Sequence, residues 1–524
     1  MTTDSQVNET LAKCKVSEGK ATVVCFNSSS FYNPVQEFNR DLSIAVLRRF
    51  INDLQTDSFV TTNGKSASKR RKTVPVGFAL VAENIRVIEA LAATGLRAIR
   101  YAKEVSGIGS VIANDFSDTA VETIRANVCT NSVENLVIPN FGDAVSVLHD
   151  HKRKDKRFHC VDLDPYGCPS IFLDSAIQAV CDGGILMATS TDMAVLCGNS
   201  PETCHSKYGA MPAKIKSCHE QALRILLQCI ESHANRYSRY IKPLLCVSAD
   251  FYIRVFVTVF TGQAEVKNSV CKLGYVFHCA GCGSFNIQPM AEKEERGKNS
   301  FKFKTAHGPL VNNRCENCQS RVEMAGPLWT DGLYDIEFVK RLINDLNQLT
   351  EETALNTSKR IIGMLSVALE ELHDVPLFYV HDQLCSAVRV SAPKMRIIRS
   401  AILNAGFEVS GSHTNSQAIK TNAPNKLIWD ILRAWAKKNN VNMVKIASNT
   451  IAHNILKQVT EYDICFDIHV QSEPNSKLNK LLRYQQNPEP NWGPGRHAKG
   501  SISSKSQAAY APSRAEDCAL SKGD

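Results

Sequence analysis

The sequence lacks any apolar run that approaches the roughly 18 residues a membrane-spanning helix needs. Its first 20 residues contain no arginine and no apolar core, which excludes a secretory signal peptide and argues against a mitochondrial presequence. We expect no membrane partner and a nuclear protein, with the cytoplasm or the mitochondrion as alternatives. The basic run over residues 64–72 fits an ordinary solvated loop, and alternatively a nuclear-import signal or an RNA contact.

The composition excludes a secreted disulfide framework. Nineteen cysteines are scattered along the chain, many within apolar runs, which indicates reduced thiols in an intracellular protein. An apolar share of 44% and a charged share of 22% are ordinary for a globular chain long enough for two or three domains. The net charge of +9 favours a polyanionic partner. No internal repeat is present, and we expect a monomer.

Strand and helix patterns alternate from residue 87 to residue 190, which predicts an α/β fold with a parallel, doubly wound sheet. Short apolar segments predict five strands, at Val87–Leu91, Ser110–Asp115, Leu136–Asn140, Phe158–Leu163 and Ile185–Ser190. Helical spacing of apolar residues predicts helices at Leu42–Leu54, Ala98–Val105, Ser117–Cys129 and Ala213–His233. A β-branched and aromatic run, Phe251–Phe260, predicts one more buried strand.

Acidic side chains follow three of these strands. Asp115 ends the second strand, Asp143 follows the third and Asp164 follows the fourth. At the shared edge of a parallel sheet, such acids suit a nucleoside cofactor, with Asp115 on the ribose hydroxyls and Asp143 near an adenine amine. The first turn, Ala92–Gly95, has a single glycine. S-adenosylmethionine therefore fits better than a dinucleotide, because it has no pyrophosphate to bind.

The segment Val161–Cys168 reads Val-Asp-Leu-Asp-Pro-Tyr-Gly-Cys. Pro165 stiffens the turn, so the Asp164 carboxylate can face a planar amine while Tyr166 lies against the ring that carries it. The segment resembles the Asp/Asn-Pro-Pro-Tyr/Phe turn with which class I methyltransferases position an exocyclic amine for methylation. The alternative is an ordinary strand-to-helix turn, in which Asp, Pro and Gly are all common.

Several longer blocks, between about Phe31 and Trp435, resemble the tRNA (guanine) N2-dimethyltransferase family. They are Phe31–Asp41, Ala92–Arg100, Asp162–Gly167, Thr191–Gly198, Ser232–Arg236 and Ala249–Val255. The resemblance implies tRNA as partner and dimethylation of N2 of the guanine at position 26. By matching position it implies a catalytic role for Asp164, with Pro165 and Tyr166 shaping the base pocket. It also implies cofactor contacts at Arg40, Arg97, Asp115, Asp143 and Ala144.

Three alternatives accompany this resemblance. Arg40 and Arg97 could hold the methionine carboxylate of the cofactor, or each could be an ordinary helix-surface arginine. The chain could methylate a neighbouring tRNA guanine or another exocyclic amine, such as adenine N6. It could also be a tRNA-binding chaperone that has lost catalysis. Members of the family often carry Phe where Tyr166 stands, and either ring can stack on a base.

Two CxxC pairs, Cys279/Cys282 and Cys315/Cys318, have the spacing of a structural Zn(II) site with four thiolate ligands. The thirty-two residues between them exceed the usual fifteen to twenty, and a lysine- and glutamate-rich segment, residues 291–304, accounts for the excess. A chance pairing in a cysteine-rich chain is the alternative. A redox CxxC is less favoured, because neither pair opens a βα unit.

The domain division expected from these patterns has five parts. Residues 1–30 are a flexible N-terminus, 31–270 the methyltransferase domain, 271–326 the zinc module, 327–476 a C-terminal α/β tRNA-binding domain and 477–524 a disordered basic tail. In the C-terminal domain, helices are expected at Asp335–Leu349, Leu355–Leu372, Lys394–Leu403 and Leu427–Lys438. Its basic residues predict a phosphate-binding surface or, alternatively, a solvated face: Lys394, Arg396, Arg399, Lys420 and Lys426.

Overall fold

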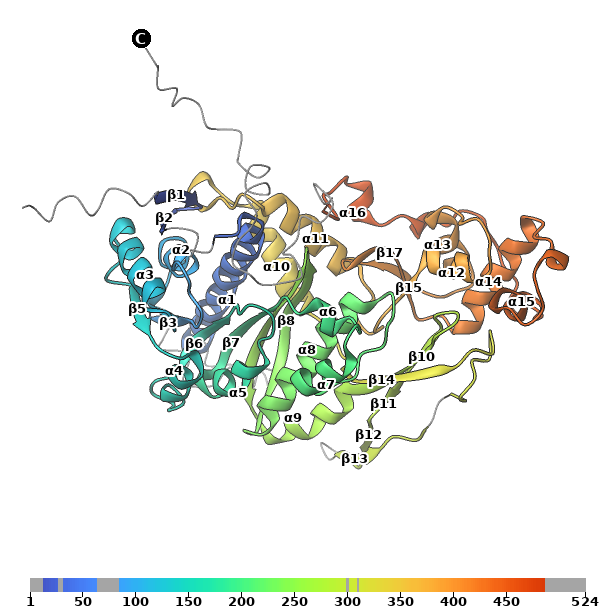
Figure 1. Ribbon diagram of the computed structural model, residues 1–524, viewed down its shortest axis with the longest axis horizontal. Coiled ribbons are helices and arrows are strands. Elements are labelled where there is room, and N and C mark those ends of the chain that lie inside the picture. Colours follow the sequence, from blue (N-terminus) through green and yellow to red (C-terminus); the bar gives the residue numbers. More distant parts are fainter. Residues whose placement is uncertain (1–12, 27–31, 64–83, 298–300, 309–310, 486–524) are drawn as a thin grey trace, which may run out of the picture.

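The computed structural model describes residues 13–26, 32–63, 84–297, 301–308 and 311–485 (Figure 1). The basic run at residues 64–72 and the tail beyond residue 485 lie outside the described residues. Within the described ranges, no helix is long and apolar enough to cross a membrane.

A seven-stranded sheet forms the centre of the catalytic half, with the strand order β5-β4-β3-β6-β7-β9-β8. The first five strands in this order, from β5 through β4, β3 and β6 to β7, pair in parallel. Strand β9 pairs antiparallel with both β7 and β8. The expected parallel, doubly wound sheet is confirmed, and an antiparallel pair extends one edge. The strands are β3 (Ile85–Glu89), β4 (Ile108–Asp115), β5 (Val137–Phe141), β6 (Phe158–Leu163), β7 (Val180–Ser190), β8 (Arg239–Ala249) and β9 (Tyr252–Thr261).

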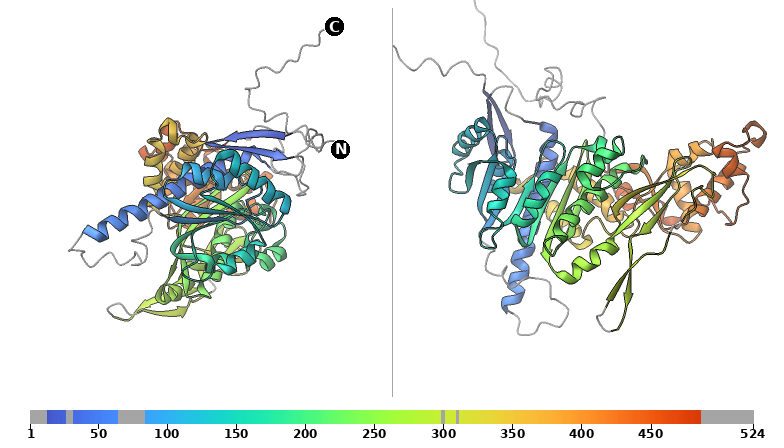
Figure 2. Two further views of the ribbon diagram at one scale, coloured as in Figure 1. Left: turned by 90° about the vertical axis from the view of Figure 1, so that its left-hand side faces the viewer. Right: turned by 60° about the horizontal axis from the view of Figure 1, so that its bottom comes forward.

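Helices cover both faces of this sheet (Figures 1 and 2). Every residue of β6 is buried, as expected of a strand covered on both sides, and its sequence is correspondingly apolar apart from His159 and Asp162. The helices are α1 (Glu37–Asn63), α2 (Leu96–Glu104), α3 (Asp118–Asn131), α4 (Ala144–Asp150), α5 (Ser170–Ala179), α6 (Met193–Leu196), α7 (Pro201–Tyr208), α8 (Cys218–Asn235) and α9 (Gln263–Asn268). The short α6 occupies part of the segment between residues 191 and 198.

The N-terminal segment is a correction to the sequence-based division. Residues 13–26 form an antiparallel hairpin, β1 (Lys13–Glu18) and β2 (Ala21–Phe26), where loose order was expected. The hairpin is fixed by partners from α3, because Asn127 and Asn131 accept hydrogen bonds from the β2 backbone at 2.8 and 3.0 Å. Glu18 is buried against two arginines, which anchors the hairpin to the catalytic domain.

The cysteine pairs lie at the end of a second, smaller sheet with the order β11-β10-β14. A two-stranded hairpin, β12 with β13, extends from it at the bottom of Figure 1. The strands are β10 (Leu273–Cys279), β11 (Phe285–Pro289), β12 (Ala291–Glu295), β13 (Phe301–Thr305) and β14 (Val322–Trp329).

The C-terminal part contains a three-stranded antiparallel sheet with the order β15-β17-β16, surrounded by helices. All four helices expected there are present as α10, α11, α13 and α14. The elements are α10 (Ile336–Asn347), α11 (Ser358–Glu370), β15 (Tyr379–Val380), α12 (His381–Ala387), α13 (Met395–Asn404), β16 (Val409–Ser412), β17 (Asn415–Thr421), α14 (Asn425–Lys438), α15 (Ile451–Leu456) and α16 (Asn475–Leu478).

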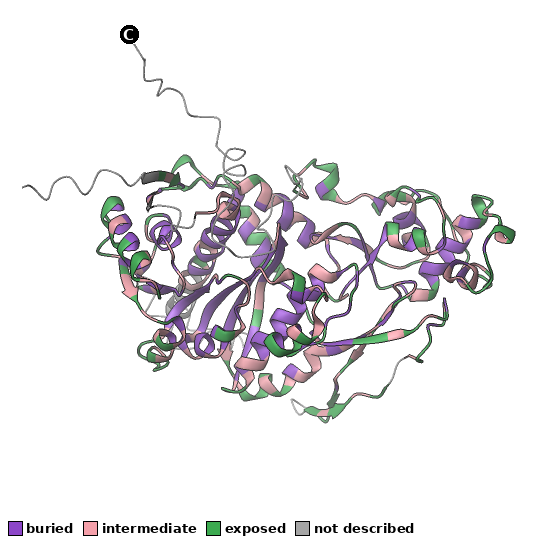
Figure 3. Cartoon of the chain, in the orientation of Figure 1, coloured by how far each residue is buried: buried purple, intermediate pink, exposed green. Residues whose placement is uncertain are grey.

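Figure 3 shows the buried residues in purple along the central sheet and the helices beside it. They form two large apolar cores, whose limits differ from the domain boundaries expected from the sequence. One apolar core runs from the central sheet through β14 into α10 and α11, so the expected boundary at residue 326 falls inside a strand of that core. Arg49 of α1 forms a 3.0 Å ion pair with Asp345 of α10 across the same junction. A second core contains the four cysteines together with residues of α12, α13, α14 and α15. The cysteine module therefore packs as part of the C-terminal unit.

Candidate functional site

The turn between β3 and α2 carries the first group of the site. Gly95 caps α2 at φ 73°, a left-handed conformation that favours glycine, and an added Cβ there would lie 3.1 Å from Ile124. Asp115, at the end of β4, accepts hydrogen bonds from the backbone N–H of Ala93 at 2.9 Å and of Ser117 at 3.0 Å. These two bonds fix the carboxylate at the edge of the sheet, and lone pairs on both oxygens stay available to a ligand hydroxyl.

Asp143 and Ala144 follow β5 at the same edge. Asp143 is the N-cap of α4, and its Oδ2 accepts hydrogen bonds from the Ser146 backbone N–H at 2.9 Å and from the Ser146 hydroxyl at 2.8 Å. The bond from the Ser146 backbone holds the pKa of Asp143 below its ordinary value. Ala144 is buried as the first residue of the helix. The carboxylate is therefore exposed and ionised, at a helix start that also suits anions.

Asp162, inside β6, is a buried carboxylate with three partners. It contacts Arg97 Nη1 at 3.2 Å, the Tyr101 hydroxyl at 2.7 Å and Arg254 Nη2 at 2.9 Å. Burial would raise the pKa of Asp162, but Arg254 and Arg97 hold it below its ordinary value. Arg254 lies within the apolar strand β9, so its buried charge requires this carboxylate. The network fixes the end of β6 directly before the Asp-Pro-Tyr turn.

Asp164 lies just beyond β6 and keeps 20% of its side-chain surface exposed. Its Oδ2 pairs with Arg97 Nη2, so one arginine connects Asp164 to Asp162. Pro165 is buried, whereas Tyr166 is 68% exposed. Partial burial of the Tyr166 hydroxyl and the nearby charges of Asp164 and Asp115 raise its pKa to about 12. The charges of Asp164 and Asp115 therefore both act on the Tyr166 hydroxyl.

The loop after β7 supports this turn from the other side. The Thr191 hydroxyl accepts a hydrogen bond from the Gly167 backbone N–H at 2.8 Å, and the Thr191 N–H donates to the Gly167 carbonyl at 3.0 Å. The Ser190 hydroxyl donates to the same carbonyl at 3.1 Å. Gly167 has φ 79°, a conformation that these bonds hold in place. The position of the turn therefore depends on the segment from Ser190 onward.

The two arginines expected at the cofactor are both buried rather than on a helix surface. Arg40 pairs with Glu18, at 2.6 Å from Nε, and donates to the Asn33 carbonyl at 3.1 Å. Arg97 is surrounded by Glu89, Asp162 and Asp164. The surface alternative is excluded for both side chains by their burial.

Two exposed aromatic residues at the site edge were missed by the sequence analysis. Phe116 directly follows Asp115 and is 72% exposed, and Phe141 ends β5 and is 55% exposed. A large apolar ring that immediately follows a strand-end acid is a usable signal, because ligands of open α/β sheets bind at the carboxyl ends of the strands. Arg254 was also missed, although a single arginine in the run Phe251–Phe260 indicates a buried acidic partner.

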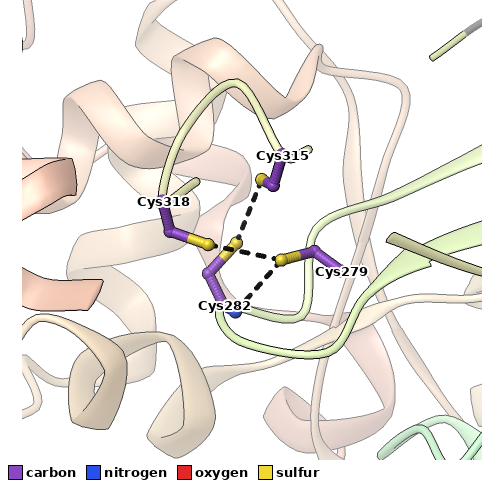
Figure 4. A group of neighbouring side chains, drawn as sticks. All are labelled: Cys279, Cys282, Cys315 and Cys318. Atoms are coloured by element: carbon purple, nitrogen blue, oxygen red, sulfur yellow. Dashed lines mark hydrogen bonds between the residues drawn. The ribbon is translucent and has the colours of Figure 1, made fainter. Parts of the chain in front are cut away.

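The four predicted zinc ligands converge in one buried cluster (Figure 4). Cys279 Sγ lies 3.3 Å from Cys318 Sγ, and Cys282 Sγ lies 3.7 Å from Cys315 Sγ. These separations suit four thiolates around one tetrahedral Zn(II), with Zn–S bonds of about 2.3 Å and no open position. The donor set fits a structural metal, and the intervening segment forms the β12–β13 hairpin.

The predicted basic surface of the C-terminal part is smaller than expected. Lys394 and Arg396 are exposed, but Arg399 is buried on the inner side of α13. Lys420 is also buried, because its ammonium pairs with Glu220 at 2.9 Å and with Glu371 at 3.4 Å. Lys426 is exposed and pairs with Glu461. The assignment of Arg399 and Lys420 to a phosphate-binding surface is therefore wrong.

A mostly parallel sheet with carboxylates at adjacent strand ends, next to an Asp-Pro-Tyr turn, defines a Rossmann-like, S-adenosylmethionine-dependent methyltransferase of class I. The chain belongs to the family described as N2,N2-dimethylguanosine tRNA methyltransferase, whose model matches residues 11–433.

Named relatives agree with this family over most of their length. The tRNA (guanine(26)-N(2))-dimethyltransferase of Drosophila melanogaster is 44% identical over 486 residues, covering 89% of this chain and 84% of that protein. The enzyme of the same name from Caenorhabditis elegans is 46% identical over 499 residues, covering 93% of each. The structure of Trm1 from Pyrococcus horikoshii with S-adenosyl-L-methionine matches with 28% identity and a TM-score of 0.63, covering 79% of this chain and 98% of that chain.

Proposed function

We propose that this protein is a tRNA (guanine(26)-N(2))-dimethyltransferase that uses S-adenosylmethionine. The observation that carries the proposal is the placement of Asp164. Its carboxylate is partly exposed at the edge of the sheet, fixed by Arg97, and followed by an exposed aromatic ring. That arrangement suits a flat base whose exocyclic amine must be held still, and the family match specifies guanine N2 of tRNA.

The side chains at the sheet edge suit the ribose and the adenine of the cofactor. We propose that Asp115 binds the ribose hydroxyls, that Asp143 and Ala144 face the adenine, and that Phe116 and Phe141 supply apolar surface beside it. The free lone pairs of the Asp115 carboxylate and the exposure of both rings support this assignment.

The methionine carboxylate is assigned to Arg97 and Arg40. Both guanidinium groups are already paired with acidic side chains, so a ligand carboxylate has to share the donors of Arg97 with Asp164. An arginine has five N–H donors. Asp162 pairs with one terminal nitrogen of Arg97, and Asp164 pairs with the other.

In the proposed mechanism, bound S-adenosylmethionine supplies an electrophilic methyl group. Asp164 accepts a hydrogen bond from the guanine amine, directs the nitrogen lone pair, and takes up the proton that the amine loses. Pro165 keeps the turn rigid, and Tyr166 stacks on the base. Arg97 keeps the carboxylate in place, and Thr191 holds Gly167 behind it.

The central test replaces Asp164 by Ala and by Asn. Asp164→Ala should lower the rate of methyl transfer by about 10²–10⁴ with little change in affinity for tRNA, because the side chain acts mainly in the transition state. Asp164→Asn should keep part of the activity if positioning dominates, because the amide oxygen still accepts a hydrogen bond. The measurement is transfer of labelled methyl to unmodified transcripts with guanine or adenine at position 26.

Each alternative function has its own outcome in this assay. Wild-type rates in Asp164→Ala would contradict the catalytic assignment. Equal labelling of both transcripts would indicate a neighbouring guanine or another base as substrate. Absence of methyl transfer by the wild-type protein, with tRNA binding retained, would indicate an RNA chaperone.

A second prediction concerns the cofactor. Asp115→Ala should weaken S-adenosylmethionine binding by about 1.5–3 kcal/mol, because a charged acceptor is withdrawn from two hydroxyls. Isothermal titration calorimetry measures the affinity directly. Asp118→Ala, which changes an acid in the first turn of α3, is the matched control and should leave the affinity unchanged. Equal affinities of wild type and Asp115→Ala would contradict the ribose assignment.

We further propose that the C-terminal part supplies tRNA affinity, that the protein acts as a monomer, and that it works in the nucleus. The exposed Lys394 and Arg396 support the first point. The other two points rest on the sequence alone.

A further inference from the structure

Among the described residues, a second group of metal-ligand side chains lies apart from the four-cysteine cluster. It consists of Cys197, Cys218 and His219, whose ligand atoms all lie within 4.8 Å of one another. Cys197 immediately follows α6, while Cys218 and His219 are the first two residues of α8. The three side chains are partly buried, so an ion from solution can reach them although they are not fully hydrated.

The separation of these atoms is close to that of ligands on a shared ion. Bonds of about 2.3 Å to sulfur and 2.0–2.1 Å to nitrogen put two ligands of one tetrahedral Zn(II) about 3.5–3.8 Å apart. The upper limit of 4.8 Å for this group therefore leaves at most about 1.3 Å for the side chains to close when the ion binds. In the four-cysteine cluster, the sulfur separations of 3.3 and 3.7 Å meet the same limit. Two thiolates and one imidazole are ligands that Zn(II) prefers, and hard cations such as Mg²⁺ do not.

The backbone around the group is fixed before any ion binds. Gly198 has φ 92°, and a Cβ on it would lie 2.9 Å from the Ala213 carbonyl oxygen. The chain just after Cys197 therefore passes directly against the segment that leads into α8. Gln221 of α8 bonds both the Ala213 N–H and its carbonyl, at 3.0 and 2.9 Å. Cys197 is therefore held in a constant position relative to the start of α8.

The imidazole is also oriented. Ser248 Oγ lies 3.2 Å from His219 Nδ1, the kind of contact that sets the ring plane and tautomer of metal-bound histidines.

We propose that Cys197, Cys218 and His219 form a second zinc site, with three protein ligands and a fourth position open to water. Binding replaces the two thiol protons by the metal and releases them to solvent. The site would fasten the segment after β7 to α8. That segment carries Thr191, which bonds Gly167 in the Asp164 turn, so the ion would stiffen the support of the turn from behind. The inference does not depend on which base is methylated.

The test is zinc content of the full-length protein, measured by mass spectrometry of the metal after dialysis against metal-free buffer. Wild type should hold two zinc ions per chain. Cys197→Ser and Cys218→Ser should each hold one, while Cys229→Ala, which changes a buried cysteine of α8 outside the group, should hold two.

Cobalt substitution of the wild-type protein decides the matter without any variant. With both sites filled, the thiolate-to-cobalt absorption should correspond to six thiolates per chain. Absorption of four thiolates, or one zinc per chain in the wild type, overturns the proposal. A Cys197–Cys218 disulfide found by peptide mass in protein purified without reductant, at one zinc per chain, overturns it in favour of a redox pair.

Discussion

At the scale of single residues, Arg97 holds the catalytic edge together. Its guanidinium lies 3.6 Å from Glu89 and 3.2 Å from Asp162, and it also pairs with Asp164. Although burial would lower the pKa of Arg97, the charges of Asp164 and Asp162 keep it above its ordinary value. Glu89 is the weakest partner, since burial raises its pKa to about 8. Removing this one cation takes an ion-pair partner from the buried Glu89 and Asp162 and from the partly exposed Asp164, while Asp162 keeps Arg254.

Arg97→Met should therefore destabilise the fold by about 3–5 kcal/mol, the usual result of breaking a buried ion pair from one side. The control is Arg125→Met, because Arg125 pairs with Glu122 on the exposed face of α3 and should change stability by less than about 1 kcal/mol. Hydrogen exchange of the β6 backbone amides measures both effects. Equal protection of β6 in the two variants would contradict this role for Arg97.

The sequence alone was sufficient to predict the position of the acidic residues at the sheet edge, but not the burial and the partners of the arginines. Asp115, Asp143 and Asp164 follow strands of a parallel sheet, and their common edge follows from topology alone. The partner of Arg40, Glu18, belongs to a segment that looked unstructured, although its two strands pair with each other as a hairpin. The hairpin is attached to the catalytic domain by Asn127 and Asn131, about a hundred residues away, and such long-range contacts leave no local pattern to detect.

At the scale of elements, the four-cysteine cluster connects the sheet β11-β10-β14 to helices of the C-terminal part. Gly281 has no Cβ, and one built there would lie 2.2 Å from Ser320 Oγ, so the two CxxC turns approach as closely as glycine allows. Trp429 of α14 donates from Nε1 to Ser284 Oγ at 2.7 Å, directly beside the cluster. Asn454 of α15 donates to the Cys318 carbonyl at 3.1 Å. Helices α14 and α15 thus rest on turns whose shape the metal sets.

Loss of this zinc should loosen α14 and α15 while the central sheet stays folded. In the double variant Cys282→Ser/Cys315→Ser, zinc content should fall by one per chain, because site formation is coupled to folding. Hydrogen-exchange protection should fall in α14 and α15 and stay unchanged in α5, which serves as the internal control. Unchanged zinc content in the double variant would contradict the four-cysteine assignment.

Elements of the catalytic sheet were predictable to within a few residues, because buried parallel strands and amphipathic helices have distinct periods. Strand β8 was not predicted, since Lys242 and Pro243 interrupt its apolar pattern and the strand lies at the sheet edge. The expected domain boundary near residue 326 rests on a similar change of pattern. Composition changes there, but β14 and α10 continue the packing of the central core.

At the scale of the whole molecule, buried charges join the catalytic and C-terminal units. Glu220 of α8 pairs with Arg224 at 2.8 Å and with Lys420 of β17 at 2.9 Å. Burial would raise the pKa of Glu220, but Lys420 and Arg224 lower it to about 2. Lys420 therefore stabilises the junction between the catalytic and C-terminal units and is not available to bind RNA. Exposed cations at the start of α13 are the better candidates for binding phosphate.

Lys394 and Arg396 are the pair to test for tRNA binding. The double variant Lys394→Glu/Arg396→Glu should bind tRNA more weakly, and the slope of log affinity against log salt should decrease by about one unit for each phosphate that the protein no longer neutralises. Lys426→Glu is the control, because that exposed lysine is already paired with Glu461 and should leave the slope unchanged. Filter binding or anisotropy across a salt series gives the slope, and methyl transfer at saturating tRNA should stay near the wild-type rate. An unchanged slope in the double variant would reduce the start of α13 to a solvated helix face. A collapse of the saturated rate would instead place these two side chains at the chemistry.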